Sequence, residues 1–594
     1  MRPSSFLPAQ CCRAEWLDAD HYITSIGYNL AIASISEPSD FEFLEGHSQT
    51  ISAFAVSKDK SFLASGQAGK EDVNEKSTPV ILWDINSRRQ IMVLRGHKGA
   101  IKNIAISEDN RLVAVSTDIS TNIWIWDTQE QDLAMFLDPG AIPSTICFAG
   151  ANKNEWNLHI TYDRRLCEYV IKFDHRTFEY SEKHDLYTNP TNGYFRSYNS
   201  SCGEFPYFFA GSVSGEVSVY NATSRTLRTF VEIDQFALAS MVSIDAKTIA
   251  VGGQSLSLVT GDDTNWKCSK QVKFDAPISF MSYFNGRFLI RTEDTCLYLV
   301  DGKSLRSQKI LDGIRAPVLS VTCNNNRIAC AALGKTGTAL LNVSGPISLI
   351  TIVNVQSKTV CAMPNNDFIV GLLDGSLICL KENGSIAYRT PSIHRGPITA
   401  LCVTKEFICS GGEDGFLRLV THQSRSLVNE SLVHNGAVNQ IIAAEGFPQR
   451  VHSVAADRTL TTTEITTGKR ICQQVGTGRI GFQACQQFKD GEGEVIVGMG
   501  DGSLKAYDWP RKGIIFEERT PDGLQINSIA LKPGNGRVLA CAGVCEYISM
   551  IDFQTGSWSV FGPAHTLETH SLCWSPDGKI LLSAADDGLA LWKF

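Results

Sequence analysis

Two consecutive segments near the start of the chain share one pattern, a Gly-His pair followed at a distance by a Trp-Asp pair. The first segment runs from Gly46-His47 to Trp83-Asp84 and the second from Gly96-His97 to Trp126-Asp127. Each has room for four short strands, in which a buried His and a buried Trp brace successive strands of one sheet. Such a sheet needs neighbours to bury both of its faces, so two clear units predict many less clear ones.

Degraded copies of the pattern continue to the C-terminus. Each copy has an apolar strand, a run of small residues, an acidic-Gly turn and another apolar strand. Clear copies cover residues 397–420, 436–465, 526–552 and 565–592, and weaker copies cover residues 144–171, 207–221, 277–301, 317–343 and 368–381. Counted from Trp16, about fourteen units of about 42 residues fit the chain, the length typical of a WD40 propeller blade.

The number of units predicts the architecture. One propeller closes with about four to eight blades, so fourteen require two rings. We therefore predict an all-β fold of tandem WD40 β-propellers with seven blades each, an N-terminal propeller over residues 1–314 and a C-terminal one over residues 315–594. An N-terminal strand often completes a distant blade, which leaves open the ring to which the strands of residues 21–34 belong.

Composition limits the class of partner. The net charge of −8 disfavours nucleic acid and anionic membranes as partners, because both require Lys and Arg concentrated on one face. No apolar run reaches the length of a membrane span, and the first residues lack the apolar core of a signal peptide, so we expect a cytoplasmic protein. Many of the 18 cysteines lie in apolar strands, which predicts free thiols.

The sequence contains little that indicates catalysis. It lacks the HExxH, complete Walker A and GxSxG motifs. Gly334-Lys335-Thr336 resembles the end of a P-loop, but Ala329 stands where that motif requires its first Gly. Cys11-Cys12 and the pair Cys541 and Cys545 lack a second pair of ligands at zinc-site spacing. We expect no enzyme activity, no catalytic residue, no metal, no cofactor and no small-molecule substrate.

The marked residues of the repeats are expected to be structural. Histidines at blade-opening positions should form hydrogen bonds inside their blades, together with the Trp and Asp marks; the set is His47, Trp83, Asp84, His97, Trp126, Asp127, His394, Asp414, His434, His565 and Trp592. Acidic-Gly turns at Asp374, Asp414, Asp501 and Asp587 supply the positive φ that tight hairpins need, so they do not require an acid-base role.

Two segments exceed the repeat pattern. Extra residues after Gly66 lengthen the distance from His47 to Trp83 to 36 residues, against 29 from His97 to Trp126. This insertion is either a solvated loop or a partner-contact loop, and its candidate contact residues are Lys70, Glu71, Asp72, Glu75 and Lys76. The segment of residues 173–196 mixes aromatic and charged residues, which fits either an interface loop or an ordinary linker between blades.

Part of the chain resembles a known family. Residues 44–107 (LEGHSQTISAF to HKGAIKNIAIS), residues 394–420 and the terminal LLSAADDGLALWKF are similar to the cilia- and flagella-associated protein 52 family of motile axonemes. The resemblance implies a microtubule inner protein, a double propeller inside the B-tubule of the doublet microtubule near the inner junction. It also implies tubulin and other luminal proteins as partners, and the cytoskeleton of the cilium or flagellum as the location.

Two other functions remain open at this point. One is a cytoplasmic double-propeller adaptor that acts on the outer microtubule lattice or on actin, although the coiled coil usual in outer-lattice relatives is absent from this sequence. The other is an enzyme with its site in a central channel, since a propeller fold does not fix function. No convergent set of acid, base or metal-binding residues supports the enzyme.

Overall fold

The computed structural model describes the chain except for residues 1, 10–12, 70–76, 153, 163–164, 178, 188–196, 326, 448, 477–480, 489–492, 510, 535–536 and 564, and the side chains of residues 150–152. In the described residues the regular elements form fourteen antiparallel sheets of four strands each. This confirms the predicted all-β fold of WD40 blades. None of the described segments forms a helix that could cross a membrane.

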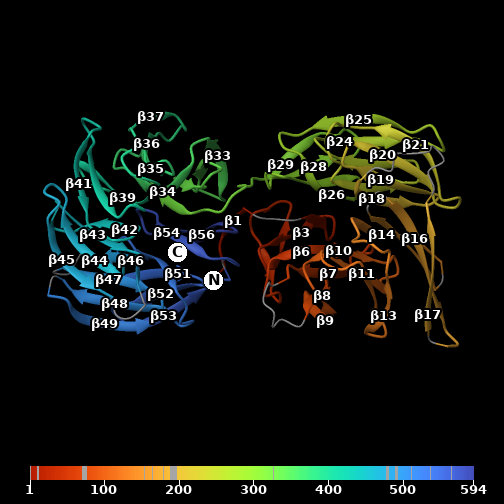
Figure 1. Cartoon of the computed structure of the whole chain (residues 1–594), viewed down its shortest axis with the longest axis horizontal. Coiled ribbons are helices and arrows are strands. Elements are labelled where there is room, and N and C mark those ends of the chain that lie inside the picture. Colours follow the sequence, from red (N-terminus) through yellow and green to blue (C-terminus); the bar gives the residue numbers. More distant parts are fainter. Residues whose placement is uncertain are drawn as a thin grey trace. The chain divides into compact units, whose positions relative to one another are not determined.

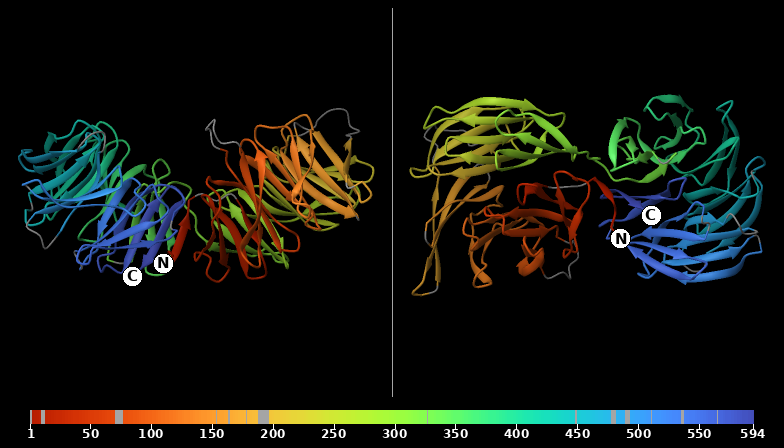
Figure 2. Two further views of the ribbon diagram at one scale, coloured as in Figure 1. Left: turned by 90° about the horizontal axis from the view of Figure 1, so that it is seen from below. Right: turned by 180° about the vertical axis from the view of Figure 1, so that it is seen from behind.

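The chain divides into two compact units, one of residues 11–311 and one of residues 1–10 with 312–594. Each unit contains seven sheets (Figures 1 and 2). The division follows Leu311, whereas the sequence suggested domains of 1–314 and 315–594, and the first ten residues belong to the C-terminal unit.

The N-terminal unit has seven blades of consecutive strands. Its strands are β2 (Ala14–Trp16), β3 (His21–Ile26), β4 (Asn29–Ser34), β5 (Glu42–Leu44), β6 (Ile51–Val56), β7 (Phe62–Gln67), β8 (Thr78–Asp84), β9 (Arg89–His97), β10 (Ile101–Ile106), β11 (Leu112–Thr117), β12 (Ile123–Asp127), β13 (Asp132–Leu137), β14 (Thr145–Asn152), β15 (Glu155–Tyr162), β16 (Arg165–Asp174), β17 (Glu179–Leu186), β18 (Tyr198–Glu204), β19 (Tyr207–Ser212), β20 (Glu216–Asn221), β21 (Thr226–Glu232), β22 (Ser240–Asp245), β23 (Thr248–Gly252), β24 (Ser255–Thr260), β25 (Lys267–Lys273), β26 (Ile278–Phe284), β27 (Arg287–Thr292), β28 (Leu297–Asp301) and β29 (Ser307–Leu311).

The C-terminal unit has six blades of consecutive strands and a seventh that combines both ends of the chain. Its strands are β1 (Ser5–Pro8), β30 (Ser320–Cys323), β31 (Ile328–Ala332), β32 (Thr338–Asn342), β33 (Ser348–Val353), β34 (Ser357–Ala362), β35 (Phe368–Leu372), β36 (Leu377–Leu380), β37 (Ile386–Arg389), β38 (Ile398–Val403), β39 (Phe407–Gly412), β40 (Phe416–Thr421), β41 (Leu427–Leu432), β42 (Val438–Ala443), β43 (Arg450–Ala455), β44 (Thr459–Glu464), β45 (Arg470–Val475), β46 (Phe482–Gln487), β47 (Glu494–Met499), β48 (Ser503–Asp508), β49 (Gly513–Arg519), β50 (Ile526–Leu531), β51 (Val538–Gly543), β52 (Ile548–Asp552), β53 (Ser557–Phe561), β54 (Thr569–Trp574), β55 (Ile580–Ala585) and β56 (Gly588–Lys593).

The position of a strand in its blade determines its residues. The second strands, such as β7 and β39, are almost wholly buried because both faces pack on neighbouring blades, and they consist of small and apolar residues. The outermost strands, such as β41 and β45, are mostly half-buried or exposed and mix apolar with polar residues. The apolar cores therefore lie between blades, as in the cluster that joins Leu30 and Ile32 of one blade to Phe54 and Trp83 of the next.

The C-terminal ring closes through strand β1. This strand pairs with β56 in antiparallel register, from Ser5 opposite Leu591 to Pro8 opposite Gly588, and becomes the outermost strand of the last blade. Gly588 has a φ of +148°, and a Cβ atom there would lie 2.3 Å from the carbonyl oxygen of Leu7. Residues 21–34, whose ring the sequence left open, form β3 and β4 of the first N-terminal blade.

The N-terminal ring closes without strand exchange, where the first strand β2 packs on β26 and β27. In several other blades a glycine late in the second strand lets the next blade approach; a Cβ on Gly66 would lie 2.6 Å from Ile101. In the last blade of this ring the position equivalent to Gly66 holds Arg291, whose side chain is 1% exposed. Its guanidinium donates hydrogen bonds to the carbonyl of Thr295 and to the hydroxyl of Thr24 in the first blade.

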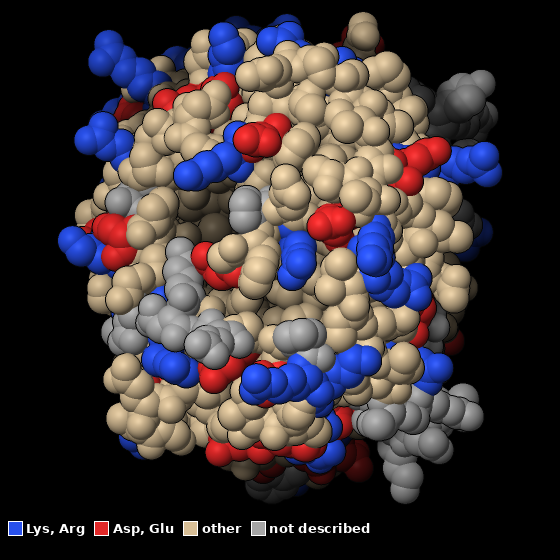
Figure 3. Space-filling model, turned by 90° about the vertical axis from the view of Figure 1, so that its left-hand side faces the viewer, with Lys and Arg blue, Asp and Glu red and all other residues tan. Residues whose placement is uncertain are grey.

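The two units differ in charge. Residues 11–311 contain 29 Lys and Arg against 37 Asp and Glu, a net charge of −8, whereas the C-terminal unit contains 25 of each. On the face of the C-terminal unit shown in Figure 3, positive and negative side chains are interspersed. The whole formal charge of the chain thus resides in the N-terminal ring.

Candidate functional site

The first clear repeat contains a hydrogen-bonded network that joins the loop before β6 to strands β7 and β8. His47 lies between Ser65 and Gln67, with 2.8 Å from its Nε2 to the Ser65 hydroxyl and 3.0 Å from its Nδ1 to the Gln67 amide oxygen. The indole of Trp83 donates to the same Ser65 hydroxyl at 2.8 Å. Asp84 stands outside this network and accepts the backbone N–H of Ser87 at 2.6 Å, which fixes the turn after β8.

The last blade contains a similar network with an aspartate in place of the glutamine. His565 contacts Asp587 at 2.7 Å through Nδ1 and Ser583 at 2.8 Å through Nε2. The Trp592 indole donates to the Ser583 hydroxyl at 3.0 Å. Asp587 also accepts from the backbone N–H and the hydroxyl of Thr566, at 2.6 Å and 2.9 Å. The network thus lies in the blade that β1 completes.

Two C-terminal blades keep the His without the Trp. His394 contacts Ser410 at 2.9 Å and Asp414 at 3.0 Å, and Arg418 forms an ion pair with Asp414 at 2.8 Å. Burial raises the pKa of Asp414, but hydrogen bonds from His394, the Arg395 backbone and Arg418 outweigh it and lower the pKa to about 2. In the next blade His434 contacts the Ser453 hydroxyl at 2.8 Å and Asp457 at 3.3 Å.

The second clear repeat is arranged differently. Trp126 donates directly to Nε2 of His97 at 3.1 Å, and Nδ1 of His97 lies 3.2 Å from the Thr78 carbonyl oxygen. Asp127, 2% exposed, accepts from the guanidinium of Arg111 at 3.0 Å and from the hydroxyl of Tyr180 in the following blade. The two Trp-Asp pairs therefore differ: Asp84 fixes a turn, whereas Asp127 joins two blades.

Burial determines the charge of these histidines. Loss of hydration lowers the pKa of His47 and of His97 to about 4, and it lowers the pKa of His394 and of His434 as well. At neutral pH His47 and His97 are therefore uncharged. Both ring nitrogens of each are already engaged inside the blade, so their arrangement braces strands and offers no free acid or base.

The five candidate contact residues of the insertion, Lys70, Glu71, Asp72, Glu75 and Lys76, lie outside the described residues. The described parts of the second unusual segment form strands rather than a loop. Residues 179–186 form β17, the outermost strand of the fourth blade, and Tyr187 is 3% exposed. The aromatic rings of Tyr180 and Tyr187 pack inside the ring, a role that the mixed composition of the segment did not reveal.

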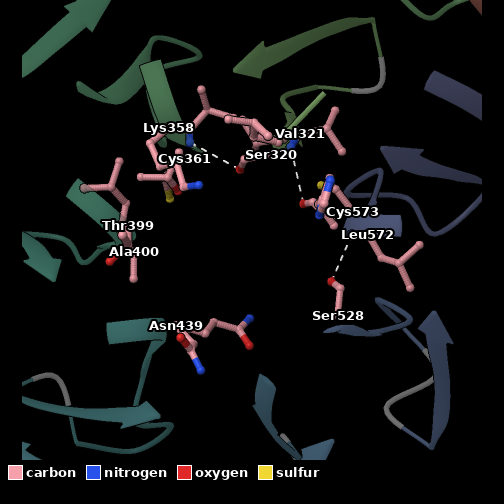
Figure 4. A pocket seen from close by; sticks show the side chains of 18 of the residues that line it. Ser320, Val321, Lys358, Cys361, Thr399, Ala400, Asn439, Ser528, Leu572 and Cys573 are labelled. Atoms are coloured by element: carbon pink, nitrogen blue, oxygen red, sulfur yellow. Dashed lines mark hydrogen bonds between the residues drawn. The ribbon is translucent and has the colours of Figure 1, made fainter. Parts of the chain in front are cut away.

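Sequence analysis missed a polar cavity of about 380 Å³ in the C-terminal unit (Figure 4). All seven innermost strands, β30, β34, β38, β42, β46, β50 and β54, contribute to its lining, so it is the central channel of this ring. Hydroxyls join successive blades around it: Ser320 accepts from the Val360 N–H at 3.3 Å and Ser528 from the Leu572 N–H at 3.0 Å. These contacts hold the channel wall in one shape.

The other motifs tested for chemistry show no convergent site in the described chain. The cysteines described are free thiols, and Cys11-Cys12 fall outside the described residues. Cys541 and Cys545 are buried, and burial raises the pKa of both thiols. No group of three or more metal-binding side chains is found in the part of the chain that the structure describes.

Comparison with known proteins agrees with this architecture. The model of the WD domain, G-beta repeat, matches residues 40–71, 88–127 and 560–593. The last range contains the whole network of His565, Ser583 and Trp592. Cilia- and flagella-associated protein 52 of Mus musculus is 22% identical over 97% of this chain and 94% of its own length, and that of Homo sapiens is 22% identical over the same shares. The protein of the same name from Chlamydomonas reinhardtii is 29% identical over 18% of each chain. The chain is therefore a WD40-repeat protein and a homologue of cilia- and flagella-associated protein 52.

Proposed function

We propose that the protein is a non-enzymatic structural scaffold of motile cilia or flagella. In this proposal it is a microtubule inner protein that binds tubulin in the lumen of the B-tubule and stabilises the doublet microtubule. The similarity to cilia- and flagella-associated protein 52 along 97% of the chain carries the proposal, because it extends over all fourteen blades and beyond the shared repeat motif.

The chemistry of the described residues is consistent with a scaffold. The marked histidines and aspartates are occupied in holding blades together, and buried aromatic residues such as Trp83 and Trp592 fill the spaces between strands. Two rigid rings offer large surfaces to several partners at once. The net charge of −8 suits contacts based on shape complementarity better than a basic surface for an acidic polymer.

Fractionation of axonemes tests the location. A tagged copy in a flagellated cell should remain with axonemes after detergent extraction and a high-salt wash, because salt screens surface charge pairs and leaves enclosed, shape-matched contacts intact. A tagged soluble protein that diffuses into the same cilia serves as the control. Release of the tagged chain with this control would contradict a luminal position and would favour a cytoplasmic adaptor on the outer lattice or on actin.

The insertion is proposed as one partner contact. Deletion of residues 70–76 leaves β7, which ends at Gln67, and β8, which begins at Thr78, in place. Thr78 must be kept, since its carbonyl oxygen contacts His97. The deletion should leave the melting temperature unchanged and reduce the amount retained on axonemes. Equal retention of the deleted and complete chains would show that this loop makes no essential contact.

A further inference from the structure

One mouth of the C-terminal channel is lined by residues at β-bulges, where each residue lacks a pairing partner on the neighbouring strand. The innermost strands have a register shift at their second residue, which leaves Lys358, Thr399 and Asn439 unpaired at equivalent positions. Gln483, Asn527 and His570 occupy the same position in the next three blades. A bulge redirects a side chain and is common beside functional sites. All six bulge residues line the cavity, and all are polar.

The cavity lining is rich in hydrogen-bond donors and contains no carboxylate among the residues described. Lys358 supplies a positive charge, and Asn439, Gln483 and Asn527 supply amide groups. Carboxylates near this mouth are already engaged on the last two blades: Asp586 contacts Nε2 of His570 at 2.8 Å, and Glu568 accepts from Asn527 at 2.7 Å. On the opposite side, no carboxylate among the described residues forms an ion pair with Lys358.

A second lysine lies beside Lys358. The turn between β31 and β32 forms a bridge to the next blade, in which Gly334 is opposite Ser357 and accepts the Ser357 N–H at 3.0 Å. Lys335 and Lys358 each follow one member of this bridged pair, which makes them diagonal neighbours with Cα atoms roughly 7–8 Å apart. Within the described chain neither lysine forms an ion pair with a carboxylate. Lys358 thus lines a cavity whose described lining contains no acidic group, and Lys335 lies beside Lys358.

We propose that Lys335 and Lys358, at the mouth of this channel, bind a tetrahedral oxyanion of the phosphate class. Ammonium groups are strongly hydrated point charges that bind phosphate without a fixed approach geometry. The oxyanion is either free phosphate or the phosphate of a phosphorylated side chain that enters the channel mouth. The site does not depend on the proposed ciliary function, since it follows from the ring alone. It is also unlike a nucleotide P-loop, because Lys335 lies in a turn between two strands.

Calorimetric titration of the complete protein tests the site. Inorganic phosphate, titrated at constant ionic strength against a chloride control, should bind with a stoichiometry of one. Lys358→Gln should weaken binding about tenfold, and the double change of Lys335 and Lys358 to Gln should abolish it. Lys381→Gln, in an exposed turn of the same blade outside the cavity, is the matched control and should bind like the unchanged protein.

A second titration distinguishes the two sources of the oxyanion. A short glycine-flanked phosphoserine peptide that binds more tightly than inorganic phosphate assigns the site to a phosphorylated partner, whereas weaker binding of the peptide assigns it to free phosphate. Unchanged circular dichroism and melting temperature establish that each variant is folded. The proposal is overturned if neither probe binds saturably, or if the double variant binds both as well as Lys381→Gln does.

Discussion

At the scale of single residues, the repeat marks perform different tasks despite a common pattern. His47 and His565 each connect a serine hydroxyl to a second side-chain acceptor. His97 instead receives the Trp126 indole directly. Asp127 uses its carboxylate to hold Arg111 of its own blade and Tyr180 of the following blade. The marked side chains are therefore all buried or hydrogen-bonded within their blades, whereas their hydrogen-bond partners differ from blade to blade.

Trp83 should be among the most sensitive positions. It is 3% exposed and packs with Ile51, Phe54 and Leu63, so Trp83→Ala should lower the free energy of unfolding by about 3–5 kcal/mol. Chemical denaturation of the complete chain measures this loss. Phe205→Ala, at a residue that is 70% exposed, is the control and should change it by less than about 0.5 kcal/mol. Equal effects of the two changes would contradict the described packing of the blade.

The buried histidines predict a loss of stability in mild acid. The pKa of His47, His97 and His452 is about 4 in the fold against 6.5 for the free side chain, so the unfolded chain takes up protons first. Their contribution is complete above about pH 6.5 and disappears as the pH falls from about 6.5 to about 4. The melting temperature should therefore stay level above pH 7 and fall steadily below it. His97→Asn should flatten this slope, whereas the exposed His175→Asn should leave it unchanged.

Much of the residue pattern was accessible to sequence analysis, within limits set by chemistry. Gly-His and Trp-Asp pairs mark a blade because a buried imidazole and a buried indole need defined partners. The blade of residues 198–232 replaces them with tyrosines, and the hydroxyls of Tyr198 and Tyr220 meet at 2.7 Å. The blades of residues 240–273 and 482–519 have neither mark, and no copy was identified there. The proximity of Lys335 to Lys358 depends on a bridge between blades, which no local pattern encodes.

At the scale of elements, the two rings close by different physical means. Backbone hydrogen bonds between β1 and β56 join the ends of the C-terminal ring. In the N-terminal ring, contacts that involve side chains join β2 to the last blade: the backbone N–H of Trp16 donates to the Ser282 hydroxyl at 3.2 Å, and Arg287 lies over the Trp16 ring at 5.1 Å. Arg291 occupies the position at which several other blades have a glycine.

Two substitutions of Arg291 distinguish the effect of its side-chain volume from the effect of its charge at the contact between the last and first blades. Its Nε has no partner in the described chain, and no carboxylate there compensates the buried charge. Arg291→Met keeps most of the volume and removes the charge, so stability should be equal or higher. Arg291→Gly opens a cavity and should lower the free energy of unfolding by about 2–5 kcal/mol. Denaturation curves compare the two variants; a loss in Arg291→Met as large as in Arg291→Gly would mean that the hydrogen bonds to Thr24 and Thr295 dominate.

At the scale of the whole molecule, one ring is continuous in sequence and the other is not. Residues 11–311 contain all the strands of the N-terminal ring, whereas the C-terminal ring requires residues from both ends of the chain. The net charge follows the same division, because the N-terminal unit carries all of it. Salt should therefore affect contacts made by the N-terminal ring more than contacts made by the neutral one.

This division predicts the behaviour of fragments. Residues 11–311 alone should fold and melt cooperatively. Residues 312–594 alone should be less stable than the same fragment with residues 2–9 joined behind Phe594 by a flexible linker, because β1 covers β56 and buries Phe6 and Leu7. Scanning calorimetry compares the two C-terminal fragments, and a linker without residues 2–9 is the control. Equal melting temperatures would indicate that β1 contributes little to the ring.

The pairing of β1 with β56 also sets a schedule for biosynthesis. Ser5–Pro8 leave the ribosome long before their partner strand β56 is made. At roughly 5–20 residues per second, translation of the residues between β1 and β56 takes about 30–120 s. Throughout this time the apolar side chains of Phe6 and Leu7 have no finished surface to cover. Until β56 emerges, Phe6 and Leu7 therefore remain apolar side chains without their folded surroundings, and a chaperone that covers them would protect the unfinished chain from aggregation.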